Sequence, residues 1–188
     1  MAEDRALLVG RFQPIHKGHI HAVREILKEH KEIVIVVGSA QASHSLENPL
    51  TAGERVYMIN KALHESDVDL SRSYIITVPD IQFNSVWPSH VRSYAPPFSI
   101  VYTGNSLVTA LFSEAGVEVR HPKLFRRPEL SGTRIRELLI KGDDSWRNFV
   151  PTSVAKLVDE LHIRSRLLSI LEDHDRQRLH NPLANHGQ

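Results

Sequence analysis

The chain has 188 residues, enough to bury one substantial core with room for a small C-terminal addition. Its net charge is +1 with neutral histidines, so no global field draws it to nucleic acid or to a membrane, and any anion must bind locally. The absence of cysteine excludes disulfides, thiolate metal sites and a cysteine nucleophile. No signal-peptide pattern opens the chain and no apolar run reaches the ~20 residues of a membrane span, so we expect a cytoplasmic protein.

Short β-branched runs alternate with helical patterns along the chain. The runs predict strands at residues 5–10, 32–38, 74–79, 99–104 and 117–120. The two most apolar runs have the pattern of strands buried on both faces, as in a parallel sheet covered by helices. Helices are predicted over residues 18–30, 51–66 and 106–116, with others beginning near 134 and 152.

This alternation predicts an α/β fold with a doubly wound parallel sheet and C-terminal helices. We expect a single domain over residues 1–174, followed by a disordered tail over 175–188 that lacks periodicity. Ligands of such sheets bind beyond the carboxyl ends of the strands, where the strand order reverses. The loop over residues 10–19 leaves the carboxyl end of the first strand, so it is a candidate binding loop.

That loop contains neither of two well-known phosphate-binding patterns. Gly10 is followed by Arg11 and Phe12, so the G-x-G-x-x-G dinucleotide fingerprint is missing. Lys17 precedes Gly18, so the Gly-Lys-Ser/Thr of a P-loop is missing too. The loop must bind an anion by other means.

The sequence His16-Lys17-Gly18-His19 provides those means at a helix N-terminus. Histidines three apart at a helix start face the same side, and the free N–H groups there favour an anion. Gly18 allows close approach of a triphosphate, and Arg11 adds a fixed fork of donors. Two alternatives are that His19 merely caps the helix while His16 is exposed, and that His16, His19 and His21 bind a metal ion.

A second cluster begins at Ser131. Either Ser131 or Thr133 is suited to cap the helix that starts near Arg134. Two arginines in that first turn, Arg134 and Arg136, oppose the helix dipole, and an anionic ligand shared between the helix end and Arg136 removes the conflict. The cluster therefore predicts a second phosphate site.

Together the H-x-G-H and S-x-T-x-x-R stretches resemble the two hallmarks of the nucleotidylyltransferase superfamily. More closely, the chain resembles archaeal-type nicotinamide-nucleotide adenylyltransferases. The resemblance covers about residues 5–165 and rests on "GRFQPIHKGH", "GSAQASHSLENPLTAGER", "PDIQFNSVWPSHV", "YTGNSLV" and "SGTRIRELL". It implies a Rossmann-like fold, the conversion of ATP and nicotinamide mononucleotide to NAD and pyrophosphate with Mg²⁺, and often a homohexamer.

The resemblance also implies roles for individual residues. His16, His19 and Arg136 are expected to be catalytic, with His19 nearest the charge that develops in the transition state. The expected ATP-binding residues are Gly10, Arg11, Phe12, Gln13, Gly18, Ser131 and Thr133. The chain departs from the family at Gly132, where the family has a serine, and at Glu47, where a basic residue would suit a polyphosphate better.

The segment "DIQFNSVW", residues 80–87, is expected to bind the nicotinamide end of the substrate. Trp87 offers a face for an aromatic ring, and Asn84 can satisfy both sides of a carboxamide. The alternative for Trp87 is a core anchor at a helix start. Asn105 is a predicted nucleotide contact or a plain turn residue.

Two further residues near these motifs are less informative. Asp80 either assists magnesium or closes a strand-end turn. Arg55 lies inside the capped helix and is expected at the surface. No metal-binding residues of the protein itself are predicted.

Two rival functions remain at this point. One is a nucleotidylyltransferase of the same fold acting on a pantetheine, flavin or glycerol phosphate. The other is a non-catalytic nucleotide sensor, which would have no need of His16, His19 and Arg136 to stabilise a transition state. Nucleic-acid binding is disfavoured because basic residues do not gather on one helix face.

Overall fold

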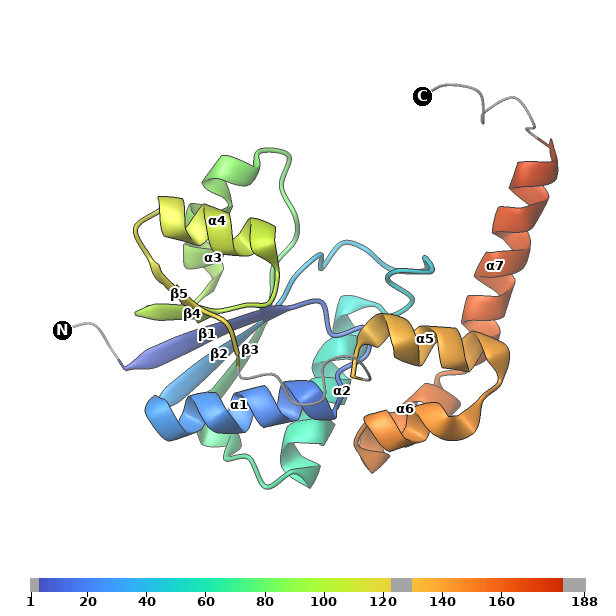
Figure 1. The fold of residues 1–188 in the computed structure, drawn as a ribbon, viewed down its shortest axis with the longest axis horizontal. Coiled ribbons are helices and arrows are strands. Elements are labelled where there is room, and N and C mark those ends of the chain that lie inside the picture. The colour runs from blue at the N-terminus through green and yellow to red at the C-terminus, as the bar shows by residue number, and fades with distance from the viewer. Residues whose placement is uncertain (1–3, 123–129, 181–188) are drawn as a thin grey trace.

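The computed structural model describes residues 4–122 and 130–180, which form a parallel sheet covered by helices on both faces (Figure 1). The strands are β1 (Arg5–Gly10), β2 (Glu32–Val37), β3 (Ser73–Thr77), β4 (Ile100–Tyr102) and β5 (Glu118–Arg120). They lie in the order β3-β2-β1-β4-β5, and every neighbouring pair is parallel. The prediction of a doubly wound α/β fold is confirmed.

Seven α-helices connect or follow the strands in the described ranges. They are α1 (Lys17–Glu29), α2 (Ala52–Glu65), α3 (Trp87–Tyr94), α4 (Ser106–Glu114), α5 (Gly132–Lys141), α6 (Thr152–Glu160) and α7 (Ile163–His180). None of the helices described is long and apolar enough to cross a membrane.

Alternating side chains of the central strands build two hydrophobic layers. Leu7 of β1 pairs with Val34 of β2 and Val101 of β4, and all three face the layer formed with α3 and α4. Their neighbours along the strands face the larger layer formed with α1, α2, α5, α6 and α7. Both faces of β1 and β2 are therefore covered, as their continuous apolar runs indicate.

The helical region expected from about residue 152 consists of two helices. α6 ends at Glu160, and α7 begins at Ile163 after His162, which adopts a left-handed φ of 52°. The left-handed residue breaks the run of helical hydrogen bonds and turns the chain. α3 was not predicted as an element, although Pro88 in its first turn is a common helix-start residue.

The expected disordered tail begins as helix. α7 continues to His180, so residues 175–180 are helical, while residues 181–188 lie outside the described ranges. Arg176 lies 3.9 Å from Glu172 and 3.8 Å from Asp173, at the i,i+4 and i,i+3 spacings of helical ion pairs. A search for apolar periodicity misses this segment because its helical pattern is one of charges.

Candidate active site

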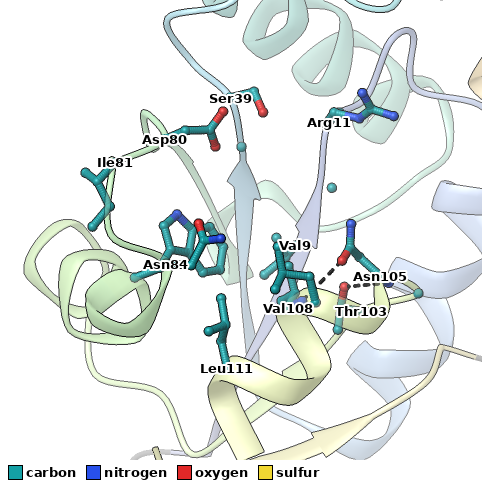
Figure 2. A pocket seen from close by; sticks show the side chains of 15 residues that line it. Val9, Arg11, Ser39, Asp80, Ile81, Asn84, Thr103, Asn105, Val108 and Leu111 are labelled. Carbon is teal, nitrogen blue, oxygen red and sulfur yellow. Dashed lines mark hydrogen bonds between the residues drawn. The ribbon is translucent and has the colours of Figure 1, made fainter. Parts of the chain in front are cut away.

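A cavity of about 620 Å³ opens at the carboxyl ends of the strands (Figure 2). Strand order reverses there, because β1 passes to β2 on one side and to β4 on the other. The cavity is lined by Val9, Gly10, Arg11, Gly38, Ser39, Asp80, Ile81, Asn84, Trp87, Thr103, Gly104, Asn105, Leu107, Val108 and Leu111. It is the switch-point crevice in which such sheets bind ligands.

Charged and polar groups lie on opposite sides of this cavity. Figure 2 shows Asp80 and Asn84 on one side, with Arg11 and Asn105 on the other. Asp80 is held by Gln41: its Oδ2 accepts from Gln41 Nε2 at 2.9 Å and its N–H donates to Gln41 Oε1 at 2.9 Å. A ligand with a phosphate at one end and a polar ring at the other suits this distribution.

Trp87 lies where the hydrophobic core and the cavity meet. Its side chain is only 7% exposed and its ring meets the Phe112 ring edge-on, with centroids 5.7 Å apart. It also lines the cavity together with Asn84, which lies in a short 3₁₀ turn just before α3. The residue is therefore part of the core and part of the cavity wall.

Asn105 also lines the cavity, but its side-chain oxygen has a structural partner. It caps α4 by accepting from Val108 N–H at 3.1 Å. The amide nitrogen of its side chain is the part that remains for a ligand. The turn and the contact expected at Asn105 are compatible.

His16 and His19 stack on each other at the start of α1. Their ring centroids are 3.6 Å apart and the planes differ by 25°. The His16 N–H donates to His19 Nδ1 at 3.2 Å, which leaves Nε2 of His19 to carry its proton in the neutral ring. His16 is the N-cap of α1, so both rings sit at the positive end of the helix.

Both histidines are held neutral. Burial lowers the pKa of His16 from 6.5 to about 4. Burial, with a further contribution from His16, lowers the pKa of His19 well below its ordinary value. At neutral pH the pair supplies uncharged N–H donors, and both are weak bases.

Gly10, Phe12 and Gly18 support the histidines. The Phe12 ring is buried and packs on His19 with centroids 4.7 Å apart. A Cβ on Gly10 would lie 2.9 Å from the Phe12 ring, and one on Gly18 would lie 3.0 Å from His16 Nδ1. The sequence predicts that Gly18 allows a triphosphate to approach. In the structure, the group that lies close to Gly18 is the His16 ring.

Gln13 and Arg136 act mainly on the backbone. The buried amide of Gln13 forms reciprocal hydrogen bonds with the backbone of Leu50, at 3.0 and 2.9 Å. Arg136 donates to Leu46 O and Gln13 O, each at 2.9 Å, and to Thr133 Oγ1 at 3.3 Å. Three of the five N–H groups of the guanidinium are thus occupied, and two remain for phosphate.

Ser131 caps α5 by accepting from Arg134 N–H at 3.1 Å, as one of the two expected caps. Gly132 packs tightly beneath it, since a Cβ there would lie 2.9 Å from Gln13 O. The family's serine at this position would need a shift of the loop before α1. This contact gives a physical reason for the glycine.

The predicted residues therefore form two adjoining groups. Gly10, Arg11, Asn84, Trp87 and Asn105 line the cavity. The histidines, Phe12, Gln13 and Gly18 join Ser131, Thr133 and Arg136 through the contacts above, beside the cavity and outside its lining. Glu47 lines another hollow, against α7, and its charge favours the charged form of Arg136.

Comparison with known proteins shows which family the chain resembles. A family model described as cytidylyltransferase-like matches residues 7–138. A nicotinamide-nucleotide adenylyltransferase of Pyrobaculum aerophilum is 55% identical over 163 residues, which cover 87% of this chain and 92% of that protein. The chain belongs to the nicotinamide-nucleotide adenylyltransferase family. Another relative so named, from Methanococcus aeolicus, is 48% identical and covers 91% of this chain and 98% of its own length.

Solved structures agree with this family at the level of the fold. A bifunctional NMN adenylyltransferase/ADP-ribose pyrophosphatase of Francisella tularensis, complexed with AMP and a Mn ion, has a TM-score of 0.72 at 19% identity. The match covers 97% of this chain and 57% of that one. The fold shared with that protein therefore extends over nearly all of this chain.

Arg55, which donates to the backbone carbonyls of the cavity-lining Gly38 and Ser39, is a residue that sequence reasoning misplaced. The expectation of a surface position is wrong, because the side chain is fully buried. It lies one turn before Met58 and Ile59, on the buried stripe of α2. An arginine on the apolar stripe of an amphipathic helix was the available signal.

Proposed function

We propose that this chain transfers the adenylyl group of ATP to nicotinamide mononucleotide, forming NAD and releasing pyrophosphate. The cavity that joins Trp87 and Asn84 at one side to Arg11 at the other carries the proposal. The relatives that share about half of its residues over nearly its whole length bear the name of this activity.

The attacking group in this reaction is the phosphate of the mononucleotide. It is anionic at neutral pH and needs no general base, which suits histidines whose pKa values are lowered. The barrier lies in bringing two anions into line and in stabilising the charge that spreads over the α-phosphate and the leaving pyrophosphate.

Neutral N–H donors at a helix N-terminus meet that need. His19 is proposed to donate from Nε2 to the reacting phosphate, because Nδ1 is occupied by the His16 N–H. His16 supports this orientation through the ring stack. Arg11 and the two remaining N–H groups of Arg136 are proposed to bind the β- and γ-phosphates.

The donor set suits Mg²⁺ that arrives with ATP. Within the described ranges, no group of three or more histidine and carboxylate side chains is placed to hold a metal ion. Asp80 is the carboxylate that lines the cavity, and one of its oxygens already accepts from Gln41. The ion supplies charge neutralisation on the triphosphate, whose oxygens are its preferred ligands.

The proposal is tested with purified protein, ATP and Mg²⁺. Nicotinamide mononucleotide, pantetheine phosphate, flavin mononucleotide and glycerol phosphate are offered separately, and pyrophosphate and the adenylylated product are measured. NAD formation at a rate well above that of the other products is expected. Turnover of another phosphate without NAD would overturn the substrate and leave the reaction class in place.

Oligomeric state and location complete the proposal. A homo-oligomer, a hexamer by family resemblance, and a cytoplasmic location are expected. Light scattering of the purified chain measures the first directly, and a mass of one chain would contradict it.

A further inference from the structure

Arg55 is a fully buried cation with no ion-pair partner in the described part of the chain. Its side chain has 0% exposure in the first turn of α2. Among the residues that the structure describes, no carboxylate lies within ion-pair distance of it. The Asp80 carboxylate favours its charge and the Arg11 guanidinium opposes it, both as charges acting through space. A buried charge of this kind is costly, so its retention calls for a reason beyond packing.

The guanidinium binds backbone carbonyls from two loops. Nη1 donates to Arg11 O at 3.1 Å and to Gly38 O at 2.7 Å, and Nη2 donates to Ser39 O at 3.0 Å. Nε donates to Thr51 O at the start of its own helix, at 3.3 Å. One side chain thus joins the loop that follows β1 to the loop that follows β2.

Both loops are strained next to these carbonyls. Phe12, which follows Arg11, has a φ of 52°, and Ser39, which follows Gly38, has a φ of 49°. Left-handed conformations are unfavourable for non-glycine residues and persist only where the surroundings enforce them. The hydrogen bonds from Arg55 to the two preceding carbonyls supply such enforcement.

The same bonds set the direction of two backbone N–H groups. The Arg11–Phe12 and Gly38–Ser39 peptides are trans, so each N–H points away from the carbonyl that Arg55 holds. Neither the Phe12 N–H nor the Ser39 N–H has an acceptor among the described residues. Arg11, Gly38 and Ser39 line the cavity and Phe12 follows Arg11 at its edge, and unpaired amides at this edge favour an anion.

We propose that Arg55 is a positioning residue that holds the Phe12 and Ser39 amides to bind a phosphate group of the nucleotide substrates. The inference rests on the proposed function, because adenylyl transfer supplies the phosphates. Arg55 itself, buried behind the strand ends, contacts no substrate. Its guanidinium is needed because a lysine ammonium cannot reproduce the fixed fork that reaches both loops.

The test compares nucleotides with their nucleosides in Arg55→Lys. Calorimetry measures the affinity for nicotinamide mononucleotide and for nicotinamide riboside, which lacks the phosphate, and likewise for ATP and adenosine. We expect at least one nucleotide to bind tenfold or more weakly while its nucleoside binds as in the wild type. Equal losses within both pairs, or no loss in a folded variant, would overturn the proposal.

Arg166→Lys is the matched control. Arg166 also donates to a backbone carbonyl, Pro49 O at 2.9 Å, and pairs with Glu54 on the same turn of α2, at 2.7 Å. Within the described ranges, the hydrogen bonds of Arg166 go to Pro49 and Glu54 and none goes to Arg11, Gly38 or Ser39. We expect a lower Tm with an unchanged ratio of nucleotide to nucleoside affinity. The same selective loss in this control would assign the effect to general loosening of α2 and overturn the proposal.

Ser39 provides a rescue and a second variant. Glycine adopts a left-handed φ freely, so Ser39→Gly added to Arg55→Lys should restore part of the lost nucleotide affinity. If Arg55→Lys does not fold, Ser39→Val replaces it, because a β-branched residue disfavours the same conformation while Arg55 stays in place. Unchanged nucleotide affinity in folded Ser39→Val would overturn the proposal. Since binding is measured without turnover, a wild type that forms no NAD refutes the proposed function separately.

Discussion

Truncation of Trp87 to alanine should lower the stability of the fold and weaken the binding of one substrate, nicotinamide mononucleotide. The ring is nearly buried and meets Phe112 edge-on, so its loss leaves a hole in the layer between the sheet and α3. Trp-to-Ala changes in cores cost about 3–5 kcal/mol. At about 2–4 °C per kcal/mol for a chain of this size, Tm should fall by about 6–20 °C.

The same ring lines the cavity, so affinity should change as well. A ring stacked on a base is worth about 1–3 kcal/mol, which corresponds to a rise in KM for nicotinamide mononucleotide of about five- to 150-fold. KM for ATP should stay nearly constant. Trp87→Phe keeps an aromatic face and should preserve much of both properties.

Phe112→Ala separates the two effects. Phe112 is fully buried against Trp87 and does not line the cavity. Phe112→Ala should lower Tm by about as much as Trp87→Ala does. At a temperature where the variant is folded, KM for ATP and KM for the mononucleotide should both change little. Steady-state kinetics beside thermal melts measure both. If Trp87→Ala lowers Tm and leaves KM for the mononucleotide unchanged, the ring is a core anchor alone and the stacking argument is refuted.

Other predictions concern the histidines and the glycines. His19→Ala should lower kcat by on the order of a hundredfold with little change in ATP affinity, and near-normal single-turnover rates would contradict this. The pKa of His16 lies at about 4 when folded, below its unfolded value, so its contribution to stability is present above pH 6.5 and is lost as pH falls toward 4, by on the order of 3 kcal/mol. Urea midpoints at pH 7 and 4.5 should therefore differ less in His16→Gln than in the wild type, and an equal difference would count against it. Gly132→Ala should lower Tm because its Cβ would lie 2.9 Å from Gln13 O. Gly53→Ala, with nothing within 4 Å of the new Cβ, should raise stability by about 0.5 kcal/mol. Equal Tm values for the two variants would refute the contact at Gly132.

The fold could be predicted because its signals are local and repeated. Continuous apolar runs at β1 and β2 indicate strands covered on both faces, and the alternation with helices fixes a parallel sheet. The position of the binding loop follows from the end of β1 alone. Boundaries differ by a residue or two, as at β3, which spans Ser73–Thr77 where 74–79 was expected.

The structure brings the predicted site residues close together, but it gives some of them partners that the sequence does not indicate. Gln13 was assigned to ATP, yet its amide bonds Leu50, which is far away in sequence. No sequence pattern announces such a pairing, because it depends on how the loop before α2 returns to the loop before α1. Burial of His16, and hence its lowered pKa, is likewise a tertiary property.

Arg55 shows where the limit lies. The sequence places Arg55 on the same face of α2 as buried apolar residues, which indicates a core position. Its charge indicates a surface position, and the prediction follows the charge. The position on the helix was the correct guide, because backbone carbonyls beyond the strand ends have no strand partner. One guanidinium satisfies several of these carbonyls at once. A cation on an apolar stripe at the start of the helix that follows a binding loop is therefore better interpreted as an organiser of that loop.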